Sequence, residues 1–188
     1  MRIFKGIVCF VVLSVSAFGF GSLAHSQARP SPKTQVISVD PLGMAINQPL
    51  MFQYEWKVGP IYSWAVRAYY WPSRAASSGP VSDEWSAFGV GGAYRIYIAD
   101  SRALTGLSVA PAANVFFFHG SELGRSGISV WIGGDIAYKW IFDEFSIEPL
   151  IELAIGFGPQ GGQSSGPAVP AYTTGTQAVI GLSGGYAW

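Results

Sequence analysis

One short stretch of the sequence places a base beside a nucleophile. His119, Gly120, Ser121 and Glu122 follow an apolar run. Residues i and i+2 of a strand point to the same side, so the His119 imidazole could activate the Ser121 hydroxyl. Such chemistry also needs an acid that orients the histidine, and Asp135, on the next predicted strand, points to the opposite side. The stretch is a candidate for ester hydrolysis, with an ordinary loop as the alternative.

A larger set of charged residues shares one side of the alternating segments described below. Glu148 and Glu152 look like a catalytic carboxylate pair, but four strand residues separate them by roughly 13 Å, too far for most glycosidases. Unpaired buried charges are very unfavourable, so acids and bases on one inward side should pair. The set predicts an ion-pair plug, and a narrow ion path or proton-coupled gate is the alternative. Its members are Asp40, Glu55, Lys57, Arg67, Arg95, Asp135, Lys139, Glu148 and Glu152.

Several other chemistries find no support in the sequence. Cys9 and His25 fall in the N-terminal apolar region, which leaves His119 as the single further histidine and no metal constellation. No helix pattern follows the paired glycines, so they do not form a phosphate-binding loop. The near-neutral charge and the lack of a basic cluster argue against nucleic acid. We therefore expect no metal and no cofactor.

The segments that carry these side chains alternate with period two. In 127–141, Ile128, Val130 and Ile132 share one side, whereas Asp135 and Lys139 share the other. Such alternation predicts a strand with one apolar face. The same pattern predicts eight strands over 35–45, 50–57, 61–71, 86–98, 104–118, 127–141, 145–158 and 175–188.

The connections between these segments differ in length. Those after the second, fourth and sixth strands are tight, whereas 72–85 and 159–174 are long and rich in Gly, Ser and Pro. Short periplasmic turns and longer outer loops are typical of outer-membrane barrels, which predicts periplasmic positions for both termini. Pro111 and Pro149 lie inside predicted strands, where β-bulges are expected.

The first residues predict export. Arg2 and Lys5 precede a short apolar run, and small residues at 26 and 28 offer a cleavage site, so residues 1–28 read as a signal peptide and 29–188 as one domain. Charged residues make up only 12% of the chain, yet no later segment approaches the roughly 18 apolar residues of a membrane helix. The fold class we expect is therefore all-β, an eight-stranded antiparallel up-and-down transmembrane β-barrel.

Large aromatic residues gather at the ends of the predicted strands, on the apolar side. Two belts of this kind are typical of the two interfaces of a membrane. The periplasmic belt would hold Trp56, Tyr62, Tyr94, Tyr138, Trp140, Phe145, Tyr186 and Trp188, and the opposite belt Phe52, Tyr70, Phe88, Phe117 and Phe157.

Three stretches carry resemblances. The tail GLSGGYAW, with Leu182, Tyr186 and Trp188 in step, resembles the terminal aromatic signature of outer-membrane proteins. The stretch VDPLG at 39–43, followed by FQYEW, resembles small uncharacterised outer-membrane barrels of the OmpX and OmpW size class. These resemblances imply contact with outer-membrane lipid, lipopolysaccharide and the barrel-assembly machinery, in a monomer. The His-x-Ser of 119–121 resembles that of outer-membrane lipid A deacylases.

Three functions remain open at this point. The first is a barrel without enzymatic activity, plugged by side chains, with a structural or surface-interaction role through loops 72–85 and 159–174. The second is a narrow channel for small solutes. The third is an outer-leaflet lipid A deacylase that would use His119 and Ser121.

Overall fold

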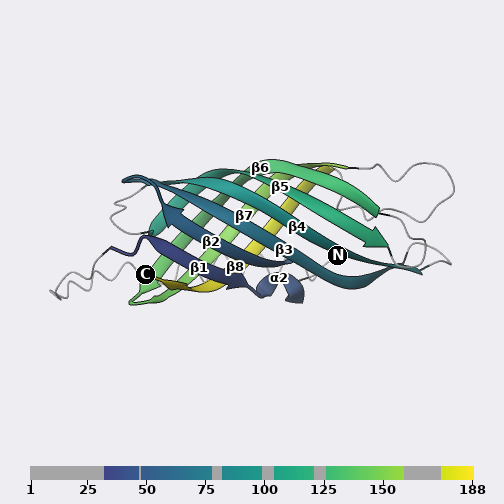
Figure 1. Cartoon of the computed structure of the whole chain (residues 1–188), viewed down its shortest axis with the longest axis horizontal. Coiled ribbons are helices and arrows are strands. Elements are labelled where there is room, and N and C mark those ends of the chain that lie inside the picture. The colour runs from purple at the N-terminus through teal and green to yellow at the C-terminus, as the bar shows by residue number, and fades with distance from the viewer. Residues whose placement is uncertain (1–31, 47, 78–81, 99–103, 121–125, 159–174) are drawn as a thin grey trace, which may run out of the picture. The chain divides into compact units, whose positions relative to one another are not determined.

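The structure, a computed structural model, describes residues 32–46, 48–77, 82–98, 104–120, 126–158 and 175–188. In these ranges eight antiparallel strands close into a barrel in chain order, each bonded to its neighbours and β8 bonded to β1 (Figure 1). The all-β, eight-stranded antiparallel barrel predicted from the alternation is confirmed. The strands are β1 (Gln35–Asp40), β2 (Leu50–Lys57), β3 (Tyr62–Ser77), β4 (Ser82–Tyr97), β5 (Gly106–Gly120), β6 (Ser126–Phe142), β7 (Phe145–Phe157) and β8 (Gly175–Ala187).

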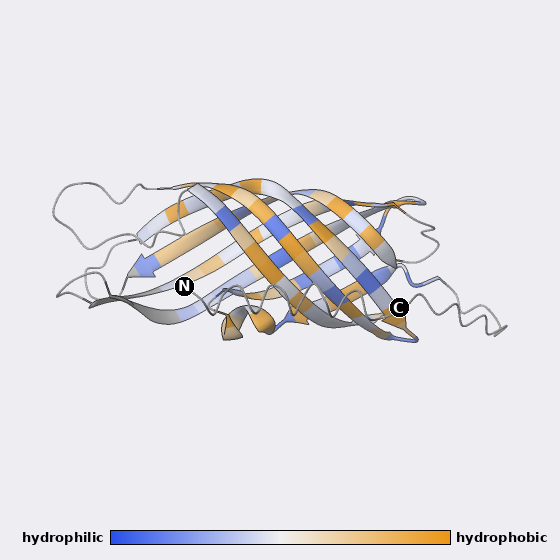
Figure 2. Cartoon of the chain, turned by 180° about the vertical axis from the view of Figure 1, so that it is seen from behind, coloured by the Kyte–Doolittle hydropathy of each residue, from blue (hydrophilic) through white to orange (hydrophobic). Residues whose placement is uncertain are grey.

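The two faces of the wall differ as the period-two pattern predicts. Along β7, for example, burial alternates residue by residue from Phe145 to Phe157. Outward-facing side chains are mostly large and apolar, whereas inward-facing ones are small, aromatic or charged. Figure 2 shows the alternation as bands of opposite hydropathy along the strands. The fold thus leaves most of its large aliphatic side chains on the outside, the reverse of a sandwich core.

Tight turns and the last residue of the chain mark one end of the barrel. The tight β2–β3 and β6–β7 turns lie at the end where Trp188 closes on Thr34 and Gln35 through backbone hydrogen bonds. The β6–β7 turn places Asp143 at a positive φ of 54°, which a two-residue hairpin loop requires. We call this end the Trp188 end. The other end, where β3, β5 and β7 finish, is called the loop end.

The predicted strand pattern is wrong at two places. The first strand stops at Asp40, and Leu42–Ala45 form a helical turn, α2, because Pro41 cannot donate to a strand ladder and its fixed φ suits a helix start. The segment predicted as a long loop, 72–85, is strand through Ser77 and again from Ser82. A register shift between Trp71 and Arg74 takes up Pro72, and strand pairing then continues beyond it.

The expectation of bulges at Pro111 and Pro149 is also wrong. Each proline lies inside a strand whose register is the same on both sides, because a missing N–H removes one hydrogen bond without adding a residue. The flanking pairs are Ala93 with Ala112 and Ile96 with Val109 for Pro111, and Ala137 with Leu150 and Trp140 with Ile147 for Pro149. In the part of the chain described, no helix is long and apolar enough to cross a membrane.

Candidate functional site

The centre of the barrel holds seven of the nine charged residues predicted from the sequence. Three bases, Arg67 of β3, Arg95 of β4 and Lys139 of β6, meet four acids, Glu55, Asp135, Glu148 and Glu152, all with almost no exposed surface. They are brought together because each occupies an inward position of its strand, and the closed wall turns all inward positions toward one axis. We call these seven residues the charge cluster.

Arg95 is the most connected member of the charge cluster. Its Nη1 donates to Glu55 Oε2 at 3.0 Å and to Glu148 Oε2 at 2.8 Å, while its Nη2 lies 2.8 Å from Glu148 Oε1. Its Nε is 3.9 Å from Asp135 Oδ1, an ion-pair distance that is too long for a hydrogen bond. Lys139 completes this half of the cluster, with Nζ bonded to Glu55 and 2.8 Å from Glu148 Oε2.

Arg67 organises the other half. Its Nη1 donates to Glu152 Oε2 at 3.0 Å, and its Nη2 pairs with Asp135. Its Nε donates to Gln53 Oε1 at 2.9 Å, and the same oxygen lies 3.3 Å from Arg95 Nη2, so Gln53 joins the two arginines. Most of these pairs connect strands that are not neighbours in the wall, such as β3 with β7 and β4 with β2. The charge cluster therefore braces the barrel across its interior.

Neutral polar side chains complete the cluster, and none of them is among the residues predicted from the sequence. Glu55 Oε1 accepts from Ser63 Oγ at 2.5 Å and from Tyr97 OH at 2.6 Å. Asn114 Nδ2 donates 2.7 Å to Glu152 Oε1 and its Oδ1 accepts from Tyr69 OH at 3.1 Å. The signal that would have found them is the inward parity that they share with the charged residues.

The two other predicted members, Asp40 and Lys57, lie elsewhere. Lys57 shares the inward parity but is the last residue of β2, half-buried near the Trp188 end. Asp40 is buried at the end of β1, where its carboxylate accepts hydrogen bonds from the backbone N–H groups of Leu42 and Leu182. Asp40 therefore links β1, α2 and β8 rather than joining the central pairs.

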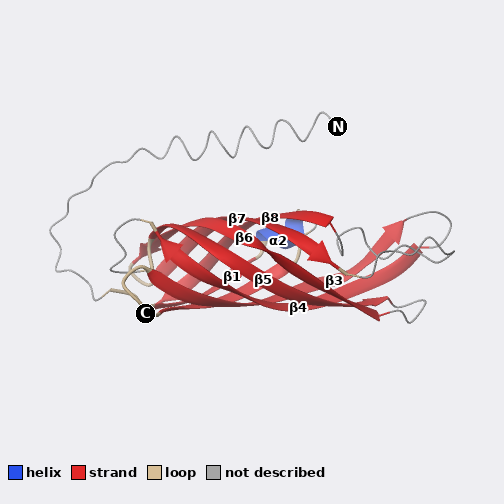
Figure 3. Ribbon diagram, turned by 90° about the horizontal axis from the view of Figure 1, so that it is seen from above, coloured by secondary structure: helices blue, strands red, loops and turns tan. Residues whose placement is uncertain are grey.

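Asp40 belongs to a seam in the wall that the sequence pattern did not predict. The β1–β8 ladder covers only Val36–Val39 against Gly184–Ala187. Farther along β8, side chains replace the missing strand: Gln48 Oε1 accepts from Ile180 N at 3.0 Å, and Gln48 Nε2 donates to Ala178 O at 3.3 Å. Figure 3 shows α2 beside β8 at this part of the wall. Alternate residues of β8 thus stay hydrogen-bonded although the neighbouring strand has ended.

We expect Gln48→Ala to loosen this seam. The substitution leaves the Ile180 N–H and the Ala178 carbonyl unpaired, which should cost about 1 kcal/mol locally and speed amide exchange at Ile180 by roughly fivefold to tenfold. Hydrogen exchange of the folded barrel measures this. Gln35→Ala is the matched control, because the Gln35 side chain accepts from Tyr54 OH on the outer face, whereas its bonds to Trp188 are made by the backbone and survive the substitution. Equal protection of Ile180 in both variants would contradict a latching role for Gln48.

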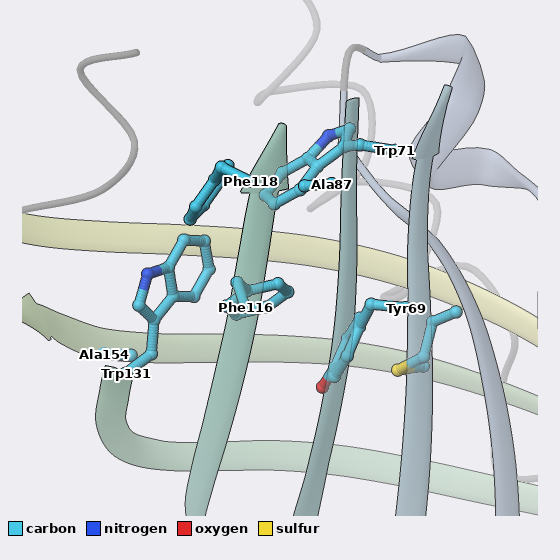
Figure 4. Close-up of a cluster of buried hydrophobic side chains, with 8 residues drawn as sticks. Tyr69, Trp71, Ala87, Phe116, Phe118, Trp131 and Ala154 are labelled. Carbon is cyan, nitrogen blue, oxygen red and sulfur yellow. The ribbon is translucent and has the colours of Figure 1, made fainter. Parts of the chain in front are cut away.

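Between the charge cluster and the loop end, the interior is filled with aromatic rings. Trp131 packs 4.5 Å from Phe116 between ring centroids and 6.0 Å from Trp71, and Phe118 and Tyr69 join them (Figure 4). Inward Gly89 makes room for this stack, since a Cβ there would lie 2.4 Å from the Phe116 ring. The interior thus holds an aromatic layer in addition to the charged one.

The aromatic belts predicted on the outside are on the outward face. At the Trp188 end, rings stack in pairs, with centroids 5.4 Å apart for Tyr54 and Trp56 and 5.8 Å apart for Tyr186 and Trp188. Tyr62 and Tyr94 stack at 5.6 Å, and Tyr138 lies 4.6 Å from Trp140. The second set is well exposed toward the loop end or along the wall: Phe52, Tyr70, Phe88, Phe117 and Phe157.

The structure describes one of the two residues of the predicted hydrolytic pair. His119 lies exposed on the outward face at the end of β5, and Ser121 lies outside the described residues. The described partner of His119 is Ser126, whose Oγ is 3.1 Å from His119 Nδ1. Glu148 and Glu152 bind different bases, Arg95 and Arg67, so they do not act as a carboxylate pair. In the described ranges, no group of three or more His, Cys, Asp or Glu residues could hold a metal ion.

Comparison with models of known protein families gives no match, and a search of curated proteins likewise finds no match to the chain.

Proposed function

We propose that this protein is an integral outer-membrane β-barrel of a Gram-negative bacterium whose interior is closed by side chains. Its role would be structural or one of surface interaction, exerted through the two connections predicted as long loops, of which 78–81 and 159–174 lie between strands. Residues 1–28 would act as a signal peptide, and both termini of the mature monomer would lie in the periplasm. Its partners would be membrane lipid, lipopolysaccharide and, during biogenesis, the barrel-assembly machinery.

The observation that carries this proposal is the inverted distribution of polarity in the closed barrel. Large apolar side chains such as Ile132, Leu153 and Phe157 are more than half exposed, whereas Arg67, Arg95 and Glu55 are almost completely buried. In water this arrangement would expose a continuous apolar surface, which soluble monomers rarely do. In a bilayer it is favourable, because a closed barrel satisfies every strand and its apolar band faces lipid.

The charge cluster supports a closed interior over an open channel. An eight-stranded barrel is just wide enough to be filled by its side chains, and here arginine ion pairs cross it from one wall to the other. The aromatic layer around Trp131 and Phe116 adds a second obstruction on the same axis. A narrow solute channel is the alternative, and it would require these two layers to move apart.

Two measurements test the proposal. The full chain, expressed in a Gram-negative host, should be recovered in the outer-membrane fraction and migrate differently on gels before and after heating. Recovery as a soluble periplasmic protein would refute membrane residence. The purified barrel in planar bilayers should show no steady conductance, and stable single-channel openings would favour the channel instead.

A further inference from the structure

A groove of about 600 Å³ lies in the outer wall near the loop end, over β4, β5 and β6. It is open to the outside and takes no part in the charge cluster. Its volume is within the usual range for small-molecule sites, which combine apolar walls with a few polar groups. The arrangement of those two kinds of residue indicates what it could bind.

One edge of the groove is a polar row. Ser86, His119 and Ser126 lie directly opposite one another on three neighbouring strands, as the pairing of Ser86 with His119 and of His119 with Ser126 shows. The His119 ring is hydrogen-bonded to Ser126, which orients both side chains. Hydroxyl and imidazole groups can donate hydrogen bonds to an oxygen-rich, anionic group such as a phosphate.

The body of the groove is apolar. The next outward row is bulky, with Phe88, Phe117 and Ile128 directly opposite one another. Tyr70 of β3 extends this row as the partner of Phe88.

Beyond the bulky row, the outward side chains shrink. Val90, Val115 and Val130 form the following row. In the row after that, Gly92 and Ala113 are small, and Val66 of β3 and Ile132 of β6 flank them. From Phe88 to Gly92 the strand advances about 13 Å along its own axis, which at a tilt of roughly 35–45° covers about 10 Å of the roughly 15 Å hydrocarbon depth of one leaflet. Small side chains of β4 and β5 therefore follow the bulky row along the wall, and we call this stretch the furrow. The bulky row separates it from the polar row.

We propose that this groove and furrow form a binding site for a phosphate-bearing lipid of the surrounding bilayer. The phosphate would accept hydrogen bonds from Ser86, His119 and Ser126, and an acyl chain would lie along Val115 and Ala113. The proposal rests on the membrane residence proposed above, and it adds a ligand class and a leaflet, that of the loop end.

Native mass spectrometry of the purified, folded barrel tests the site. Phosphatidic acid, diacylglycerol with the same acyl chains, and inorganic phosphate are offered separately. We expect occupancy in the order phosphatidic acid, then diacylglycerol, with no retained inorganic phosphate. Ser126→Ala and His119→Ala should each reduce the preference for phosphatidic acid by about tenfold, the effect of one hydrogen bond to a charged group.

Filling the furrow should abolish binding of both lipids. Ala113→Phe is the test variant, Val115→Phe replaces it if that barrel does not fold, and Thr176→Phe, on the outward face of β8, is the matched control. Equal occupancy by phosphatidic acid and diacylglycerol, or unchanged binding in the filled variant, would overturn the proposal. Retention of inorganic phosphate at equal strength would also overturn it, as an anion site without a lipid. Each of these results leaves fractionation to the outer membrane unaffected, so failure of this site is distinguishable from failure of the proposed function.

Discussion

Replacing Arg95 by alanine is expected to destabilise the barrel by about 3–5 kcal/mol, the range for breaking a buried ion pair by removal of one partner. Arg95 has no exposed surface and contacts Glu55, Glu148 and Asp135. Without its guanidinium group, these acids face one another with only Arg67 and Lys139 to balance them. Urea-induced unfolding in lipid vesicles, followed by tryptophan fluorescence, measures the loss.

Two control variants separate charge from packing. Ser108→Ala removes a buried hydroxyl that donates to the Ala137 carbonyl at 3.4 Å, so it should cost much less than Arg95→Ala. Arg95→Met combined with Glu148→Gln should recover much of the stability, because one acid is neutralised together with one base and Glu55 keeps Lys139 as its partner. A loss below about 1 kcal/mol for Arg95→Ala would show that water reaches the cluster.

Placing an arginine in the middle of the outer wall should separate a membrane barrel from a water-soluble one. Ile132 and Ile151 are 55% and 53% exposed, and each has apolar outward neighbours on the adjacent strands. On a lipid-facing wall, Ile132→Arg or Ile151→Arg should each cost about 2–4 kcal/mol. On a wall in water, the same substitution at an exposed site should change stability by no more than about 0.5 kcal/mol.

The control for this prediction is the same substitution at the end of the wall, where the side chain would lie at the membrane interface. Phe142 is exposed on the same face but ends β6 beside the tight turn at Asp143, so Phe142→Arg should cost only about 0–1 kcal/mol. The free energies of unfolding in phospholipid vesicles decide the matter. Equal costs at Ile132 and Phe142 would contradict a bilayer centred on the middle of the wall.

The local pattern of the sequence determined the strands and their faces. Alternation is a property of neighbouring residues, so the inward position of Asp135 and the outward position of Ile132 could be derived without any partner strand. The same alternation predicted eight strands, and the short turns between them predicted antiparallel neighbours. It failed at 72–85, where the composition resembles a loop but pairing between the two arms of a hairpin continues the strands through Ser77 and from Ser82.

Only the tertiary structure decided which inward residues meet. Arg67 bonds Glu152 across 85 positions of sequence, and Arg95 bonds Glu55 across 40, because closure and stagger of the barrel set which inward residues share a level. The seam is of the same kind: Gln48 reaches Ile180 only because β1 ends early and closure brings β8 beside it. The side of the wall on which a residue lies follows from its own strand. The residues that it contacts across the interior depend on the register of all eight strands together, and no single segment of the sequence determines that register.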